Sequence, residues 1–175
     1  VAPAEITWKV GVDVLCFGGT KMGLPVGEAV VFFDRRLSED FAYRCKQSGQ
    51  LASKMRFLSA PWLGILEDEV WLKHARHANA MAQRLASGLI QVPGARLMFP
   101  VESNGVFCEL PPAVLDGLRA RGWRFYTFIG AGGARFMCGW DTLPATVDAI
   151  LADIRSLTGA GDRKSTRLNS SHRIR

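Results

Sequence analysis

The sequence contains no run of about 18 consecutive apolar residues, and its first eight residues lack the basic and then apolar order of a signal peptide. It therefore predicts neither a membrane span nor secretion. Only four cysteines occur among 175 residues, and no two of them are spaced as C-x-x-C. This usage predicts neither a zinc site nor a thioredoxin-like redox motif, and it fits a reducing, cytoplasmic compartment.

Basic residues are in excess, but most of the excess lies at one end of the chain. The formal net charge is +6, and residues 162–175 carry +4 of it. The remainder has 17 basic and 15 acidic residues, which does not predict a nucleic-acid-binding surface. Residues 161–175 are expected to be a disordered tail, because they bury too little apolar surface to offset their ordering entropy. Residues 162–172 also read like translated sequencing-adapter DNA, so we expect the tail to be foreign to the natural protein; the alternative is a natural basic tail.

The first part of the chain combines strand-like and helix-like patterns. Hydrophobic residues make up 48% of the sequence, enough for a substantial core. Short apolar runs at 12–17 and 28–33 predict two buried strands. Ser38, followed by two acidic residues, predicts a helix start. Apolar residues at steps of three and four predict one long helix from about Pro61 to Leu89.

From residue 95 onward the pattern predicts an α+β unit, in which helices cover one side of a few-stranded sheet. The expected strands are 96–99, 105–110, 123–128 and 134–139. The expected helices are 111–120 and 143–157. Aromatic residues around the third strand are expected in the core, namely Trp123, Phe125, Tyr126 and Phe128.

One lysine stands in an unusual place, within a glycine-rich loop between the first two predicted strands. The loop reads GGTKMGLPVG over residues 18–27, and its glycines favour a tight turn that a ligand can approach closely. Lys21 is a candidate Schiff-base lysine, because a partly desolvated amine has a lowered pKa and condenses with an aldehyde cofactor. Thr20 would offer a hydroxyl to a cofactor phosphate. The alternative is a solvated lysine on a hairpin, which the spacing alone favours.

Three segments of the chain resemble the low-specificity L-threonine aldolases, which are pyridoxal-phosphate enzymes of the aspartate-aminotransferase fold. They read DVLCFGGTKMGLPVGEAVVFF, FAYRCKQSGQLASKMRFLSAPW and HARHANAMAQRLASGL. The resemblance runs from about Pro3 to about Leu157. It implies an α/β fold class, with this chain as the C-terminal part. Residues 1–58 would end the cofactor-binding large domain, and residues 59–160 would form a small α+β domain with a long bridging helix.

The resemblance also implies roles for single residues. The family lysine that forms the Schiff base with pyridoxal 5'-phosphate maps to Lys21. A family arginine that holds the substrate carboxylate maps to Arg135, in the segment ARFMCGWDT, where a guanidinium binds a carboxylate bidentately. The alternative for Arg135 is a surface arginine on an edge strand. Lys54 and Arg56 fall where relatives carry a basic, glycine-rich segment near the cofactor phosphate. This chain lacks those glycines, so a solvated helix face is an equal alternative.

The implied reaction is retro-aldol cleavage of a β-hydroxy amino acid, such as L-threonine or L-allo-threonine, to glycine and an aldehyde. No residue is assigned as the general base. Two alternatives stay open: another pyridoxal-phosphate lyase, such as a phenylserine aldolase or a β-eliminating lyase, and a non-catalytic binding module. No metal site is expected, because no carboxylate or cysteine joins His74 and His77 at ligand spacing.

The resemblance further implies partners for the catalytic lysine that this chain does not contain. In the family, the aspartate that pairs with the ring nitrogen, the histidine that stacks on the ring and a second carboxylate-binding arginine all precede the lysine segment. We therefore expect the chain alone to be inactive and poorly soluble. The full-length enzyme is expected to be a cytoplasmic homodimer or homotetramer, with neither nucleic acid nor membrane as a partner.

Overall fold

The computed structural model describes the backbone of residues 1–130 and 132–171. The chain divides into two compact units, Val1–Lys73 (unit 1) and His74–Arg175 (unit 2), and the boundary falls inside a helix. The predicted domain boundary after residue 58 concerns a whole enzyme and stays a prediction. Within the described ranges, no helix combines the length and the apolarity that a membrane crossing needs.

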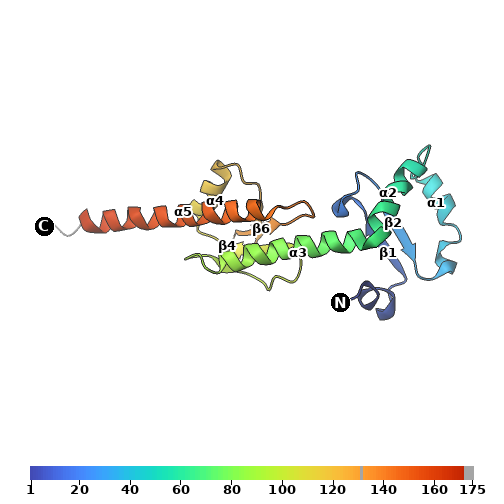
Figure 1. Cartoon of the computed structure of the whole chain (residues 1–175), viewed down its shortest axis with the longest axis horizontal. Coiled ribbons are helices and arrows are strands. Elements are labelled where there is room, and N and C mark those ends of the chain that lie inside the picture. Colours follow the sequence, from blue (N-terminus) through green and yellow to red (C-terminus); the bar gives the residue numbers. More distant parts are fainter. Residues whose placement is uncertain (131, 172–175) are drawn as a thin grey trace. The chain divides into compact units, whose positions relative to one another are not determined.

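Unit 1 is built on a two-stranded antiparallel hairpin. Its strands are β1 (Val14–Gly18) and β2 (Glu28–Phe32), which lie side by side in Figure 1. Both strands begin and end close to the predicted bounds. The helices of unit 1 are α1 (Phe41–Gln47) and α2 (Arg56–Leu66). Short 3-10 turns occupy Pro3–Ile6, Trp8–Val10, Thr20–Met22, Arg35–Ser38 and Glu67–Glu69.

The prediction that β1 and β2 are buried is wrong, because their alternate residues are exposed. Phe17 packs against two tryptophans, with ring centroids 5.5 Å from Trp62 and 5.3 Å from Trp71. Val14 and Val30 are 39% and 37% exposed. Side chains of a strand point alternately to opposite faces, and within unit 1 the tryptophans cover only one face of the hairpin.

The helix predicted to start at Ser38 starts later. Ser38 closes a 3-10 turn, and its hydroxyl donates to the Arg35 carbonyl at 2.8 Å. Helix α1 begins at Phe41 instead. The serine hydroxyl is therefore used by the preceding turn and caps no helix.

The prediction of a single long helix from Pro61 to Leu89 is also wrong, because the helix is interrupted between α2 and α3 (Val70–Leu89). Asp68 and Glu69 have φ values of 50° and 54°. These left-handed conformations cannot continue a right-handed helix. The periodic stripe consequently does not stay on one face, and Leu63 is 65% exposed.

Unit 2 contains the four predicted strands as one antiparallel sheet, in the order β3-β4-β6-β5. The strands are β3 (Arg96–Leu97), β4 (Gly105–Glu109), β5 (Tyr126–Ile129) and β6 (Gly133–Met137). Helix α4 spans Pro112–Ala120, and α5 spans Pro144–Ser171. Figure 1 shows α3, α4 and α5 beside this sheet.

The core of unit 2 lies between one face of the sheet and the three helices. Its largest fully buried side chains come from α3, β4, α4 and α5, and they are Leu89, Val106, Cys108, Leu118 and Ile154. Ala134 and Phe136 of β6 belong to the same cluster. Helix α3 contributes the stripe Ala78, Ala82, Leu85, Ala86 and Leu89.

Two of the four aromatic residues predicted in this core lie elsewhere. Trp123 and Phe125 pack against the core as predicted. Tyr126 and Phe128 are 68% and 58% exposed, which corrects the prediction. They lie on β5, one of the two edge strands of the sheet, where the alternation of the strand turns them away from the helices.

Helix α5 also runs further than the predicted end at residue 157. It continues to Ser171, so the segment expected to be disordered is helical in residues 161–171. No proline occurs between residues 162 and 171. The last four residues of the expected tail lie outside the described residues.

Candidate functional site

The lysine loop is held closed by contacts at its base. The Gly19 amide donates to the Gly27 carbonyl at 3.3 Å, and Leu24 is buried inside the loop. A Cβ on Gly19 would lie 2.6 Å from the Gly27 oxygen and 2.9 Å from Cζ2 of Trp62. Such distances leave no room for a side chain. Glycine at this position lets the turn pack directly against α2.

Lys21 lies on the 3-10 turn of this loop and is exposed. Within unit 1 as described, the turn projects from the end of a hairpin, and the partial desolvation of the amine stays a prediction for the whole protein. Thr20 is exposed beside it, and its hydroxyl donates to Oε1 of Glu28 at 3.0 Å. Gly23 and Gly27 have φ values of 109° and 110°, which close the loop on both sides.

The two other basic candidates of unit 1 are exposed near the start of α2. Lys54 has a φ of 60°, and its carbonyl accepts from the Phe57 amide at 3.0 Å. Arg56 is the first residue of α2, and its guanidinium lies 4.9 Å from the Phe57 ring centroid. Among the described residues, no hydrogen bond or ion pair joins either residue to Lys21.

Arg135 lies in unit 2, in the middle of β6. Its neighbours across the sheet are Phe107 on β4 and Tyr126 on β5. The residues on either side of it in sequence, Ala134 and Phe136, point into the core, so Arg135 occupies the opposite face. Its Nε is the buried side-chain nitrogen that lacks a hydrogen-bond partner among the described residues. An unpaired buried donor is costly and is typical of a binding site.

A pocket of about 310 Å³ lies beside Arg135. Its lining residues come from β6, from the start of β5 and from the two residues before β5, and they are Arg124, Phe125, Tyr126, Arg135 and Met137. No carboxylate is among them. Sequence reasoning missed Arg124 and placed Tyr126 in the core. No strand alternation could have found Arg124, because it precedes β5 (Tyr126–Ile129).

The two histidines of α3 are accounted for by contacts within unit 2. The ring of His74 stacks on Trp140, with centroids 5.0 Å apart. Nε2 of His77 lies 2.7 Å from the carbonyl oxygen of Thr142. Within the described ranges, no group of three metal-ligating side chains is found.

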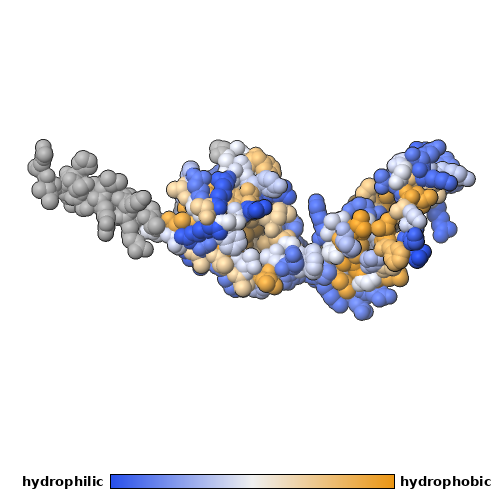
Figure 2. All heavy atoms as spheres, turned by 90° about the horizontal axis from the view of Figure 1, so that it is seen from above, coloured by the Kyte–Doolittle hydropathy of each residue, from blue (hydrophilic) through white to orange (hydrophobic). Residues whose placement is uncertain are grey.

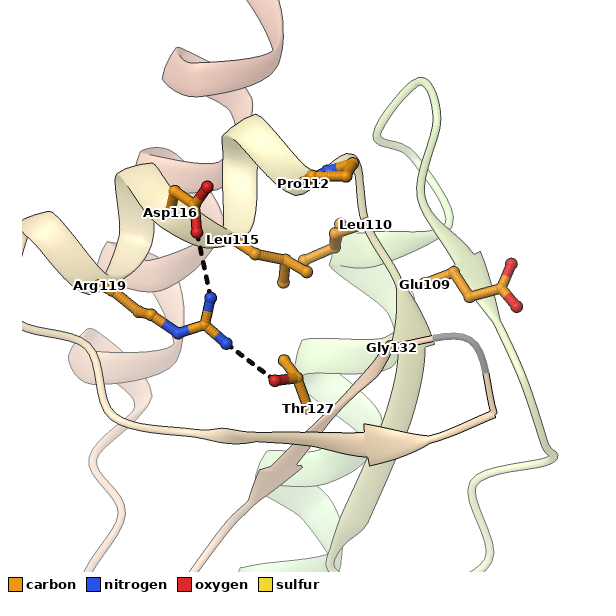
Figure 3. Close-up of a pocket in the computed structure, with 8 residues that line it drawn as sticks. All are labelled: Glu109, Leu110, Pro112, Leu115, Asp116, Arg119, Thr127 and Gly132. Carbon is orange, nitrogen blue, oxygen red and sulfur yellow. Dashed lines mark hydrogen bonds and ion pairs between the residues drawn. The ribbon is translucent and has the colours of Figure 1, made fainter.

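A larger pocket, of about 480 Å³, lies between α4 and the β5–β6 strands (Figure 3). Arg119 bridges its walls, donating to Asp116 at 3.2 Å and to the Thr127 hydroxyl at 2.9 Å. Glu109, which also lines it, pairs with Arg96. No residue implicated by the sequence lines this pocket, and its charged groups are already paired, so we do not place the site there.

The cysteines divide into buried and accessible thiols. Burial raises the pKa of the Cys108 thiol to about 12, and it also raises the pKa of Cys138. Thiols of this kind are poor nucleophiles at neutral pH. Cys16 is exposed, although its apolar neighbours predict a buried thiol. It lies on the uncovered face of the unit 1 hairpin.

Comparison with known sequences places the chain among lyases. Residues 1–111 match the family model described as beta-eliminating lyase. The chain is 65% identical over 158 residues to a low specificity L-threonine aldolase of a Pseudomonas species, and 64% identical over 159 residues to that of Pseudomonas aeruginosa. These matches cover 90% and 91% of this chain and 46% of each relative. The chain thus spans about half the length of the curated relatives it matches.

Solved structures agree with the sequence matches. A threonine aldolase of Leishmania major superimposes with a TM-score of 0.77 at 26% identity, covering 84% of this chain and 44% of that one. A glycine decarboxylase (P-protein) of the glycine cleavage system superimposes with a TM-score of 0.50 at 21% identity, covering 74% and 32%. The latter bears on the fold alone. The predicted α/β fold class, with an aspartate-aminotransferase-like fold, is confirmed.

Proposed function

The chain belongs to the beta-eliminating lyase family, and on that premise we propose that the whole protein is a pyridoxal-phosphate-dependent aldolase. It would cleave L-threonine and related β-hydroxy amino acids to glycine and an aldehyde. The observation that carries the proposal is the 65% identity, over 90% of this chain, to the low specificity L-threonine aldolase of a Pseudomonas species. This identity extends over 158 residues, which supports the same chemistry for the whole protein.

The residues of the lysine loop fit an aldehyde cofactor. Lys21 is exposed on a 3-10 turn, where an aldehyde carbon can reach its amine. Thr20 would hold the phosphate by its hydroxyl, and Lys54 and Arg56 would add positive charge near it. When bound, pyridoxal phosphate supplies an electron sink for the charge left on Cα as the bond to Cβ breaks.

Arg135 would bind and orient the substrate. Its guanidinium can hold both carboxylate oxygens, and binding would give its buried Nε the acceptor that it lacks. Fixing the carboxylate limits rotation at Cα, which determines whether the bond to Cβ or another bond is aligned for cleavage. The β-hydroxyl proton must pass to a general base. None of the described residues of this chain is assigned that role.

The assignment of Lys21 is tested by trapping the cofactor on the full-length protein. Borohydride reduction after loading with pyridoxal phosphate, followed by peptide mass spectrometry, is expected to find a phosphopyridoxyl group on Lys21. Lys21→Arg keeps the charge but not the amine, so it should lose the label and lower threonine cleavage by about 10³-fold or more. Lys46→Arg, on the exposed α1 helix, is the matched control. Labelling of another lysine, or an active Lys21→Arg protein, would contradict the assignment.

A second candidate function is another lyase of the same family, since the family model carries the description of a beta-eliminating lyase. Product analysis with threonine, phenylserine and serine separates the possibilities. Glycine with acetaldehyde indicates a threonine aldolase, glycine with benzaldehyde a phenylserine aldolase, and pyruvate a β-elimination. We expect glycine and acetaldehyde to dominate.

We further propose that the full-length protein is a homodimer or homotetramer of the cytoplasm, acting on a free amino acid. Analytical ultracentrifugation of the full-length protein checks the assembly. A monomer at micromolar concentration would contradict it.

A further inference from the structure

A third pocket of unit 2 reaches into its core at the end of β6. Its volume is about 170 Å³, and α3, the start of α5 and the end of β6 all contribute to its walls. Five apolar side chains of the walls are each at most 7% exposed, and they are Leu85, Phe136, Cys138, Val147 and Ile150. Neither Lys21 nor Arg135 is among the described residues that line it. The pocket is therefore not part of the site already described.

The walls of this pocket form an environment of low polarity. Burial raises the pKa of the Cys138 thiol, because a thiolate is poorly solvated there. Trp123 also lines the pocket, and its Nε1 is already used as a donor to Asp153 at 2.7 Å. Apolar cavities of roughly 150 Å³, lined by leucine, isoleucine and phenylalanine, stay dry and bind benzene. This pocket has the size and the walls to hold one ring or one short branched chain.

The mouth of the pocket differs from its walls, because it carries hydrogen-bond donors. Arg124 and Thr146 line the pocket and are exposed. The hydroxyl of Thr142, which also lines it, accepts from the Gly139 amide at 2.7 Å, so its own hydrogen stays available. No carboxylate is among the described lining residues. The mouth can therefore donate to an oxygen atom, but it offers no carboxylate to compensate a buried cation.

We propose that this pocket is a binding site for a small neutral molecule that combines one apolar ring or branched chain with one acceptor oxygen. An aromatic or branched alcohol has this composition. The apolar part packs against Leu85, Phe136 and Ile150, and its removal from water drives binding. The oxygen stays at the mouth, where Thr142 or Arg124 donates to it and fixes the orientation of the ligand. The proposal concerns binding alone and goes beyond the proposed aldolase reaction.

Two probes of nearly equal size, benzyl alcohol and benzylamine, test the chemical class with the full-length protein. Calorimetric titration is expected to give a dissociation constant of about 1 mM or below for benzyl alcohol. Protonated benzylamine should bind at least about tenfold more weakly, because the pocket holds no acceptor for its ammonium group. Absence of benzyl alcohol binding, or equal binding of the two probes, overturns the proposal.

A substitution at the mouth tests the location. Thr146→Trp fills the mouth from an exposed position of α5 and should weaken benzyl alcohol binding about tenfold or more. Ala149→Trp is the matched control, because residue 149 is exposed on the same helix and is not among the described lining residues. It should leave the dissociation constant unchanged. Equal binding of benzyl alcohol to the two folded variants, as judged by circular dichroism, overturns the proposal.

The wild type locates the probe without any substitution. Nuclear Overhauser effects are expected between the ring protons of benzyl alcohol and labelled methyl groups of Leu85, Val147 and Ile150, and their detection supports the proposal. Binding without any effect at these methyl groups places the probe elsewhere and overturns it. This measurement decides the proposal even if Thr146→Trp does not fold.

Discussion

At the scale of single residues, the packing of the lysine loop depends on the absence of a side chain at Gly19. The residue is buried between the Gly27 carbonyl and Trp62, so the loop packs backbone against side chain. The GGTK motif identified Lys21 as a candidate from sequence alone. The exposure of Lys21 was not predictable, because a turn looks the same in sequence whether its amine is covered or open.

Gly19→Ala is expected to destabilise the protein by roughly 1–3 kcal/mol, because the new methyl group would overlap the Gly27 oxygen and Trp62. Gly64→Ala is the matched control. No atom lies within 4 Å of its added Cβ, and alanine favours the α2 helix by up to about 1 kcal/mol. Urea denaturation measures both. Equal stability of the two variants would show that the loop tolerates expansion at Gly19.

Glu28 places a carboxylate where the cofactor phosphate is proposed to bind. Its Oε1 accepts a hydrogen bond from the Thr20 hydroxyl, so this hydroxyl is already used as a donor and is not free for a phosphate. Glu28→Gln removes this negative charge and should tighten pyridoxal-phosphate binding by about two- to fivefold. Absorbance titration of the full-length protein measures the dissociation constant, and Glu102→Gln in unit 2 is the control. Unchanged or weaker binding in Glu28→Gln would place the phosphate away from Thr20.

At the scale of elements, one carboxylate ties α5 to the segment between α4 and β5. Asp153 accepts from Nε1 of Trp123 at 2.7 Å and from the guanidinium of Arg121. The hydrogen bond from Trp123, followed by that from Arg121, lowers the pKa of Asp153 below its ordinary value. The folded state thus favours the charged carboxylate more than the unfolded state does.

A lowered pKa in the folded state means that this stabilisation is complete above the unfolded pKa of about 4, and is lost as pH falls through the folded value. Asp153→Asn should therefore lower the free energy of unfolding at about pH 7. Its difference from the wild type should shrink at about pH 3. Tryptophan fluorescence in urea measures both. The control is Asp116→Asn, which removes an exposed ion pair within α4 and should change the free energy of unfolding little at either pH. If the effect of Asp153→Asn on the free energy of unfolding does not depend on pH, the proposed role of the Asp153 charge is wrong.

Sequence patterns were enough to predict some helices and strands but not others. The four strands of unit 2 were predictable because apolar runs alternate with clear turn signals. The break between α2 and α3 was not, since Asp68 and Glu69 adopt positive φ without a glycine or proline to mark it. Tyr126 and Phe128 were assigned to the core because hydrophobicity does not reveal that β5 is an edge strand.

At the scale of the whole molecule, the two residues with proposed roles in catalysis and binding belong to different units. Lys21 lies in unit 1, and Arg135 lies in unit 2. Figure 2 shows apolar residues on the surfaces of both units, and Phe57 and Tyr126 are among the large exposed side chains. Surfaces of this kind are typical of contacts with other protein segments.

We expect the 175-residue chain, expressed by itself, not to cleave threonine, because it matches only 46% of each curated relative. Glycine release from threonine, followed by chromatography, measures the activity, with the full-length protein as the positive control. Turnover by the chain alone at a comparable rate would show that one half carries a complete site.

The tight base of the lysine loop also limits how this sequence can vary through time. Any change in the first or second base of a glycine codon gives a residue with a Cβ or a stop, and at Gly19 a Cβ meets the Gly27 oxygen at 2.6 Å. The position therefore offers no neutral first step to another residue. Lineages that keep the loop should keep this glycine, whereas Gly64 is free to drift.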